Sequence, residues 1–166
     1  MERLWAPWRR EFVVRGASPA GGEGGCIFCA LMQDDDGPGN LILHRGRSAY
    51  VVLNKYPYSN GHLMVVPFRH TGDFADLRPE EASEIFLLAQ RCVAALRERL
   101  NAHGFNVGFN VGKAAGAGIE EHVHLHVVPR WEGDHNFMAI LGGTRIIPES
   151  LDSTYETLRP AFPSRG

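Results

Sequence analysis

The chain has no apolar run that approaches the roughly 20 residues of a membrane-spanning helix. Its first residues, Met1 to Trp5, lack the apolar core of a secretory signal, so we expect none. It has no basic excess either, because 17 Lys and Arg stand against 19 Asp and Glu. A protein that binds the nucleic-acid backbone without sequence specificity needs a clustered basic face. We therefore expect neither a membrane nor a nucleic acid as partner.

Cysteine is also scarce. The chain has three cysteines, and Cys26 and Cys29 form a C-x-x-C pair. A disulfide framework uses an even number of cysteines and persists in oxidising compartments. We therefore expect a cytoplasmic protein with reduced thiols.

The length and composition fit one globular domain. The chain has 166 residues, of which 44% are hydrophobic and 22% charged, and this is enough to bury a core. We expect a docking segment and a flexible connection over residues 1–25. The main domain is expected over 26–148, and a tail with a short helix over 149–166.

The apolar pattern predicts five strands and one long helix. Pro79 and the two acidic residues after it predict the start of a helix that runs to about Ala102, with Gly104 as its stop. Because most strands follow one another through short turns, we expect an α+β fold with a mainly antiparallel sheet. Strands are predicted at 41–44, 48–54, 62–68, 105–111 and 121–129.

Three histidines alternate with apolar residues in the last predicted strand. His122, His124 and His126 are separated by Val123 and Leu125. On a strand, this period of two places the imidazoles on one face and the aliphatic side chains on the other. With only eight histidines in the chain, such a triplet is improbable by chance, so it is the candidate site.

Two kinds of chemistry compete for this triplet. In one, the three imidazoles share a catalytic divalent metal ion. The first and third histidines lie about 13 Å apart along a flat strand, however, and fit one ion less easily. In the other, one histidine is a nucleophile that attacks phosphorus, since a covalent route splits one hard displacement into two easier ones.

A glycine-rich segment leads into the triplet. Gly112, Gly116 and Gly118 follow the fourth predicted strand. Glycines let backbone N–H groups approach an anion closely, so the segment is a candidate phosphate cradle, and a flexible hairpin loop is the alternative. It is not a Walker loop, because Ala114 stands where Ser or Thr belongs.

The residues from His122 to Val128 resemble the signature of the histidine triad family of nucleotide hydrolases and transferases. The segments 54–57 and 61–67 are similar to that family's strand–turn–strand segment. The order of elements from Cys26 to Arg130 also fits the family. The resemblance implies the family's fold, with a five-stranded sheet that is extended across a homodimer.

Two further segments, Phe105–Asn110 and Trp131–Phe137, look closest to the fragile-histidine-triad branch. That branch includes bacterial diadenosine tetraphosphate hydrolases and phosphorylases. The resemblance implies an adenine nucleotide or dinucleoside polyphosphate as substrate, cleaved at the α-phosphate.

Residue roles follow from the same resemblance. It implies that His124 is the nucleophile and forms a nucleotidyl-histidine intermediate, and that His126 donates to the phosphate or the leaving group. His122 would orient its neighbours or bind zinc. Asn54 matches the position that holds the ribose hydroxyls, and Asn110 matches a polar side chain near the scissile phosphate.

The chain departs from the family just before the triad. Family members often carry Gln and Ser or Thr there, where this chain has residues 117–121 with the sequence Ala-Gly-Ile-Glu-Glu. This leaves open whether water or inorganic phosphate is the acceptor. Gly116 and Gly118 are the expected substrate-binding residues of the loop.

Cys26 and Cys29 have the spacing of metal ligands, although a redox pair or two buried thiols would have the same spacing. The resemblance implies that they act with His70 and His122. Such a Cys₂His₂ set is closed and tetrahedral, so we expect zinc in a structural role.

The positions of the other histidines in the sequence predict their surroundings. We expect His44 and His103 at the surface, at the ends of elements. For His62 we expect a structural role, with hydrogen bonding within the active-site floor as the alternative. Two other functions compete with the nucleotidyl-transfer hypothesis: a metalloenzyme with a three-histidine catalytic metal, and a protein that binds adenine nucleotides without turnover.

Overall fold

The computed structural model describes residues 25–134 and 149–163. The docking segment expected over 1–25 therefore lies outside the described residues, apart from Gly25, as do residues 135–137 of the last family-like segment. Among the helices that are described, none is long and apolar enough to cross a membrane.

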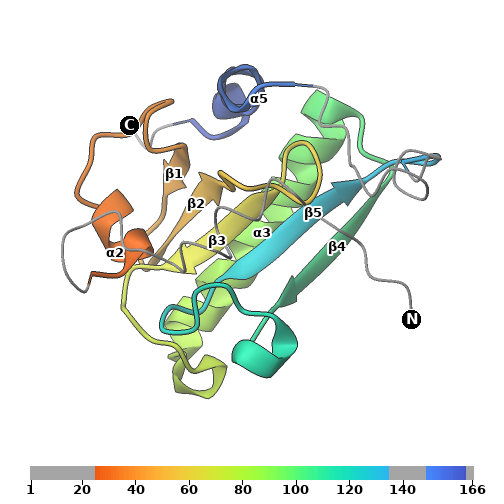
Figure 1. Cartoon of the computed structure of the whole chain (residues 1–166). Helices are drawn as coiled ribbons and strands as arrows, with labels where there is room; N and C mark the ends of the chain where they lie inside the picture. Colours follow the sequence, from red (N-terminus) through yellow and green to blue (C-terminus); the bar gives the residue numbers. More distant parts are fainter. Residues whose placement is uncertain (1–24, 135–148, 164–166) are drawn as a thin grey trace.

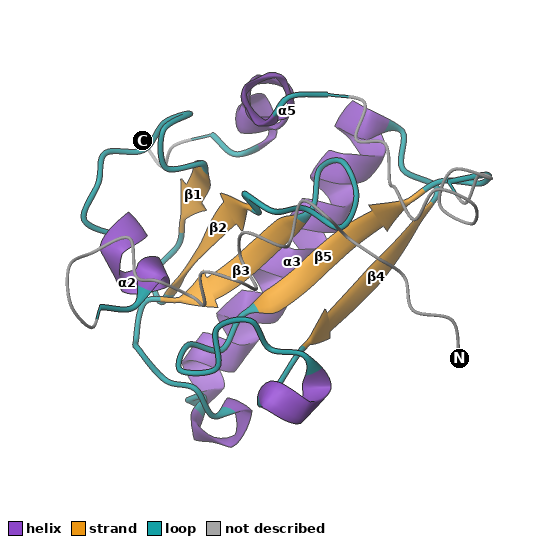
Figure 2. Cartoon of the chain, viewed as in Figure 1, coloured by secondary structure: helices purple, strands orange, loops and turns teal. Residues whose placement is uncertain are grey.

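Five strands form one antiparallel sheet in the order β1-β2-β3-β5-β4, which confirms the predicted fold class (Figure 2). After the long crossover that follows β3, the chain forms β4 at the edge of the sheet. β5 then lies between β3 and β4 and pairs with both. The strands are β1 (Ile42–Arg45), β2 (Ala49–Leu53), β3 (Leu63–Pro67), β4 (Gly104–Phe109) and β5 (Leu125–Arg130).

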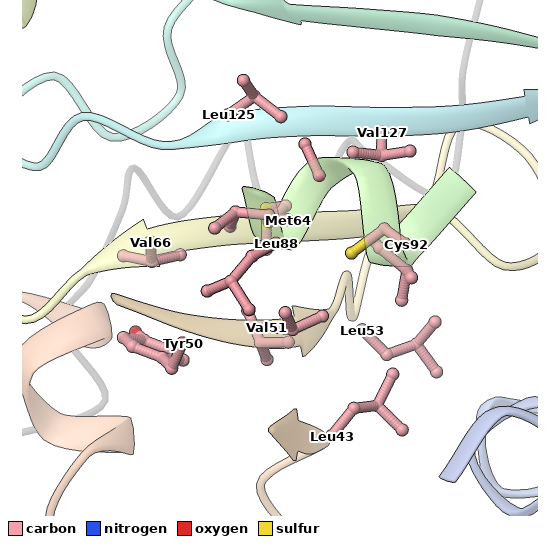
Figure 3. Close-up of a cluster of buried hydrophobic side chains, with 14 of the residues drawn as sticks. Leu43, Tyr50, Val51, Leu53, Met64, Val66, Leu88, Cys92, Leu125 and Val127 are labelled. Atoms are coloured by element: carbon pink, nitrogen blue, oxygen red, sulfur yellow. The ribbon is translucent and has the colours of Figure 1, made fainter. Parts of the chain in front are cut away.

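Helix α3 (Pro79–Leu100) lies along one face of the sheet and contacts β2, β3 and β5 (Figure 1). The other helices are shorter: α2 (Ile27–Leu31) and α5 (Leu151–Leu158), with 3-10 turns η2 (Phe74–Asp76), η3 (Lys113–Ala115) and η4 (Arg159–Ala161). The core fills the layer between α3 and the sheet, where Leu125 and Val127 of β5 join Leu88 and Cys92 of α3 (Figure 3).

Helix α3 begins where the sequence predicts and ends two residues earlier. Pro79 occupies its first turn, and the Glu81 carboxylate accepts a hydrogen bond from the backbone N–H of Arg78 at 2.9 Å. Asn101, with a φ of 50°, supplies the left-handed cap. Gly104 is therefore not the stop but the first residue of β4.

The last strand is shorter at its start than predicted. β5 begins at Leu125, so His122, which lies in a bend, and His124 both precede the strand. The ladder with β3 ends there because Pro67 has no N–H to donate. The backbone N–H of Val123 instead donates to the Thr71 carbonyl at 2.7 Å.

His44 is not a surface residue, contrary to the prediction. It is 5% exposed, and its Nε2 lies 3.1 Å from the Arg91 guanidinium of α3. The Phe162 ring covers it, with ring centroids 6.2 Å apart. The residues that bury His44 are distant in sequence, which is why its position at a strand end was misleading.

We predict that Glu81→Gln lowers the free energy of unfolding at pH 7 by about 2 kcal/mol. Arg69 donates two hydrogen bonds to the Glu81 carboxylate, at 2.8 and 2.7 Å. This contact lowers the Glu81 pKa from 4.5 to about 2. The stabilisation is therefore complete above pH 4.5 and is lost as the pH falls through about 2.

Urea denaturation at several pH values measures the effect. The matched control is Glu80→Gln, on the exposed side of the same first turn. Equal stability of the two variants at pH 7 would contradict the prediction.

Candidate active site

The three triad histidines lie in the interior of the protein at one edge of the core. His122, His124 and His126 are 0%, 5% and 9% exposed. Because Leu125 and Val127 point into the core beneath α3, the alternation directs His124 and His126 to the opposite side of the sheet (Figure 3). Their ring centroids are 4.7 Å apart.

A backbone carbonyl fixes the orientation of His124. Its Nδ1 donates to the carbonyl oxygen of His122 at 2.8 Å, because a carbonyl can only accept. Burial lowers the His124 pKa, against the opposing effect of this hydrogen bond, so the ring is neutral at neutral pH. A neutral ring with its proton on Nδ1 carries its lone pair on Nε2, which is the nucleophilic atom.

His62 supplies a chain of hydrogen bonds that fixes the tautomer of His126. The backbone N–H of Tyr58 donates to His62 Nδ1 at 3.1 Å, so that nitrogen carries no proton. Nε2 of the neutral ring must then carry it and donate to His126 Nδ1, 3.0 Å away. His126 is thereby left with its own proton on Nε2.

Asn110 lies at the end of this chain. Its side-chain amide is 3.4 Å from His126 Nε2, and an N–H at that nitrogen is satisfied when the amide oxygen faces it. At the other end, the Asn54 amide nitrogen lies 3.2 Å from His62 Nδ1, and the Asn54 oxygen accepts the Tyr56 N–H. Both predicted asparagines thus lie within the histidine network, while their contacts with a substrate stay predictions.

His62 is more important to this site than its sequence position suggested. It is fully buried and its ring stacks on Tyr58, with centroids 4.7 Å apart. The turn signal at Asn60-Gly61 located the start of β3, which His62 directly precedes, but it did not identify His126 as the partner of His62. The hydrogen bond to His126 links positions 64 residues apart, which no local pattern reveals.

The glycine-rich loop bonds mainly to itself. The N–H groups of Ala115 and Ala117 donate to the Gly112 carbonyl, and that of Gly116 donates to Lys113. Gly112 and Gly116 have φ values of 76° and 84°, which glycine adopts without strain. Gly118 is exposed in the same loop. The loop therefore keeps a defined shape, and the binding of a phosphate by Gly116 and Gly118 stays a prediction.

The four predicted metal ligands come together in a second cluster. The ligand atoms of Cys26, Cys29, His70 and His122 all lie within 4.8 Å of one another, so these residues could hold a metal ion. His122 Nδ1 is 3.3 Å from Cys26 Sγ and 3.7 Å from Cys29 Sγ. Its Nε2 donates to the Pro67 carbonyl at 2.9 Å, which leaves Nδ1 unprotonated toward the sulfurs.

The donor set fits a tetrahedral cation. Zinc bonds of about 2.3 Å to sulfur and about 2.0 Å to nitrogen place neighbouring ligand atoms about 3.3–3.8 Å apart. The observed separations of Cys29 Sγ from His70 and His122 Nδ1 are 3.5 and 3.7 Å. Burial and the neighbouring Cys26 raise the Cys29 pKa to about 11, so two thiolates here require a cation.

Comparison with known proteins gives matches over most of the chain. The model of the HIT domain family matches residues 37–133. A Mycobacterium tuberculosis protein named AP-4-A phosphorylase is 40% identical over 95% of this chain and 83% of its own length.

Solved structures show the same fold. A zinc-bound histidine triad family protein from Mycobacterium smegmatis superposes with a TM-score of 0.67 and 34% identity, over 82% of this chain and 92% of that one. A HIT family protein from Bacillus anthracis has a TM-score of 0.58 and 28% identity, over 82% and 91%.

We predict that His62→Phe changes the tautomer of His126. The variant keeps an aromatic ring but removes the donor to His126 Nδ1, so the ring is expected to divide between both neutral forms. The ring ¹⁵N chemical shifts of His126 measure this directly. His103→Phe is the control, because His103 also accepts a backbone N–H, from Glu132, but is exposed. If His126 kept a single Nε2–H form without His62, the proposed chain of hydrogen bonds would be wrong.

Proposed function

The chain belongs to the histidine triad (HIT) family, and we propose that it cleaves a dinucleoside polyphosphate at an α-phosphate through a nucleotidyl intermediate on His124. The observation that carries this proposal is the geometry of His124. Its Nδ1–H is bound to the His122 carbonyl at 2.8 Å, and this leaves the Nε2 lone pair for attack on phosphorus. The 40% identical relative named AP-4-A phosphorylase supports this substrate class.

In the first step, His124 Nε2 forms a bond to the α-phosphorus and the bond from phosphorus to the bridging oxygen breaks. The second nucleotide leaves with that oxygen. The nucleotidyl imidazole gains positive charge, which the carbonyl of His122 stabilises through the Nδ1–H. His126, with its proton on Nε2, donates a hydrogen bond to the phosphoryl or leaving oxygen.

In the second step, an oxygen of the acceptor attacks the phosphorus and the bond to His124 Nε2 breaks, which restores the neutral ring. With inorganic phosphate as acceptor, diadenosine tetraphosphate yields ATP and ADP. With water, it yields ATP and AMP. The name of the 40% identical relative favours phosphate, and we propose phosphorolysis as the main reaction.

The two competing functions fit the geometry less well. A catalytic ion shared by the whole triad would need His122 to face the other two histidines. Both nitrogens of His122 are engaged elsewhere, with Pro67 and with the cysteine sulfurs. Binding of a nucleotide without turnover does not require a buried imidazole whose tautomer is fixed with the lone pair on Nε2.

We predict that His124→Gly slows diadenosine tetraphosphate cleavage at least about 10³-fold. Wild-type protein that is quenched during turnover of α-labelled substrate should carry acid-labile nucleotide on His124. With phosphate present, ADP should exceed AMP. His103→Asn is the control, because His103 is exposed and does not contact the triad.

Full activity of His124→Gly would eliminate the covalent mechanism. Equal yields of AMP with and without phosphate would instead leave the mechanism intact and make water the acceptor.

We further propose that the cluster of Cys26, Cys29, His70 and His122 binds zinc in a structural role. The four ligand atoms support it by their closeness, and the zinc-bound relative from Mycobacterium smegmatis supports it by family membership. Such an ion would tie α2 to the loop after β3 and to the start of the triad.

Metal analysis tests this proposal. We expect about one zinc per chain in the wild type and loss of it in Cys29→Ser, with a lower melting temperature. Cys92→Ala is the control, since Cys92 is fully buried in the core and is not part of the cluster. A wild type that takes up no zinc would refute the assignment.

We also propose a homodimer in which β4 of one copy pairs with β4 of the other. The outer edge of β4 has no partner strand among the described residues, and Val107 on it is 47% exposed. At the opposite edge, the Ile42 carbonyl of β1 accepts a hydrogen bond from the Tyr155 hydroxyl of α5 at 3.2 Å. An exposed apolar strand edge favours pairing with a second chain.

We predict that Val107→Lys makes the protein monomeric in sedimentation equilibrium, while Gln33→Lys, at another exposed position, stays dimeric. A monomeric wild type would exclude the dimer.

A further inference from the structure

One aromatic residue separates the two cysteines of the metal cluster and reaches the triad. Phe28 lies on α2 between Cys26 and Cys29, and its side chain is 1% exposed. Its ring centroid is 4.8 Å from that of His124 and 5.4 Å from that of His122. The residue therefore contacts the nucleophile of the proposed function as well as a metal ligand.

The rings of Phe28 and His126 both contact the imidazole of His124. The His126 ring is 4.7 Å away in an edge arrangement, and the Phe28 ring is tilted at 52°. The hydrogen bond to the His122 carbonyl holds only one atom of the His124 ring. The plane of that ring, and with it the direction of the Nε2 lone pair, depends on these flanking rings.

Helix α2 does not hold Phe28 in place by itself. It has five residues, and Cys26 gives it no side-chain cap. A helix this short is not stable in isolation. Two contacts anchor it: the Tyr50 hydroxyl donates to the Phe28 carbonyl at 2.9 Å, and the cysteines on either side of Phe28 lie in the metal cluster.

We propose that Phe28 is a positioning residue for His124, and that the metal cluster acts on the nucleophile through it. Binding of a cation by Cys26 and Cys29 fixes both ends of the turn that carries Phe28, and Phe28 then limits rotation of the imidazole. The kinetic part of this inference rests on the proposed function, because it takes His124 as the nucleophile.

The first experiment compares Phe28→Leu with Leu31→Ala in the zinc-loaded protein. Both substitutions shorten an apolar side chain of α2. Leu31 is only partly buried, and as an aliphatic residue it makes no ring–ring contact with His124. We expect Phe28→Leu to slow single-turnover labelling of His124 by diadenosine tetraphosphate about 5- to 10-fold. The KM should change less than about 2-fold, and Leu31→Ala should leave both values near wild type.

A large rise in KM at an unchanged labelling rate would overturn the proposal, because it would make Phe28 a substrate contact. Equal losses of rate in both variants would overturn it too, by assigning the effect to the stability of α2.

The second experiment does not depend on turnover. Zn²⁺ is titrated into metal-free wild type and metal-free Phe28→Leu while the ring ¹⁵N and ¹³C signals of His124 are recorded at constant pH. In the wild type, we expect the His124 signals to sharpen to a single Nδ1–H form as zinc binds. In Phe28→Leu, zinc should bind but leave the His124 signals broad.

Identical His124 spectra with and without zinc in the wild type would refute the link. If the spectra respond as expected while His124→Gly keeps full activity, the positioning of His124 is correct and the proposed function is wrong.

Discussion

The hydrogen bond from His124 Nδ1 to the carbonyl of His122 is the contact on which the site depends. It decides which nitrogen of a neutral, buried imidazole carries the lone pair, and so which atom is able to attack phosphorus. Other parts of the sheet keep the two partners of this hydrogen bond in position. Core residues Leu125 and Val127 fix the register of β5, and the hydrogen bond from the N–H of Val123 to Thr71 holds the segment that precedes the strand.

His122 belongs to both clusters. Its side chain faces the cysteines, while its carbonyl accepts the hydrogen bond that orients His124. The same imidazole donates from Nε2 to Pro67, so its tautomer agrees with metal ligation through Nδ1. The tautomers of four neighbouring histidines are thus set by backbone groups: Pro67 and His122 carbonyls on one side, and the Tyr58 N–H acting through His62 on the other.

The sequence was sufficient for the fold class and for the candidate site because both depend on short-range patterns. The alternation from His122 to Val127 is local. The family resemblance predicted that Cys26, Cys29 and His70 form a metal cluster with His122. What failed depended on partners that are distant in the chain. His44 is buried by Arg91 and Phe162, and β5 starts late because Pro67 has no N–H. The division into segments and the cytoplasmic location stay predictions.

The contact between α5 and β1 has a consequence for how copies of this chain can associate through their strand edges. With the Tyr155 hydroxyl bound to the Ile42 carbonyl, this backbone acceptor of β1 is not available to a strand from another molecule. In the proposed dimer the two β4 edges pair with each other, so neither is left for a third copy, and a contact at β1 hinders the open-ended, fibril-like stacking to which a sheet with two bare edges is prone.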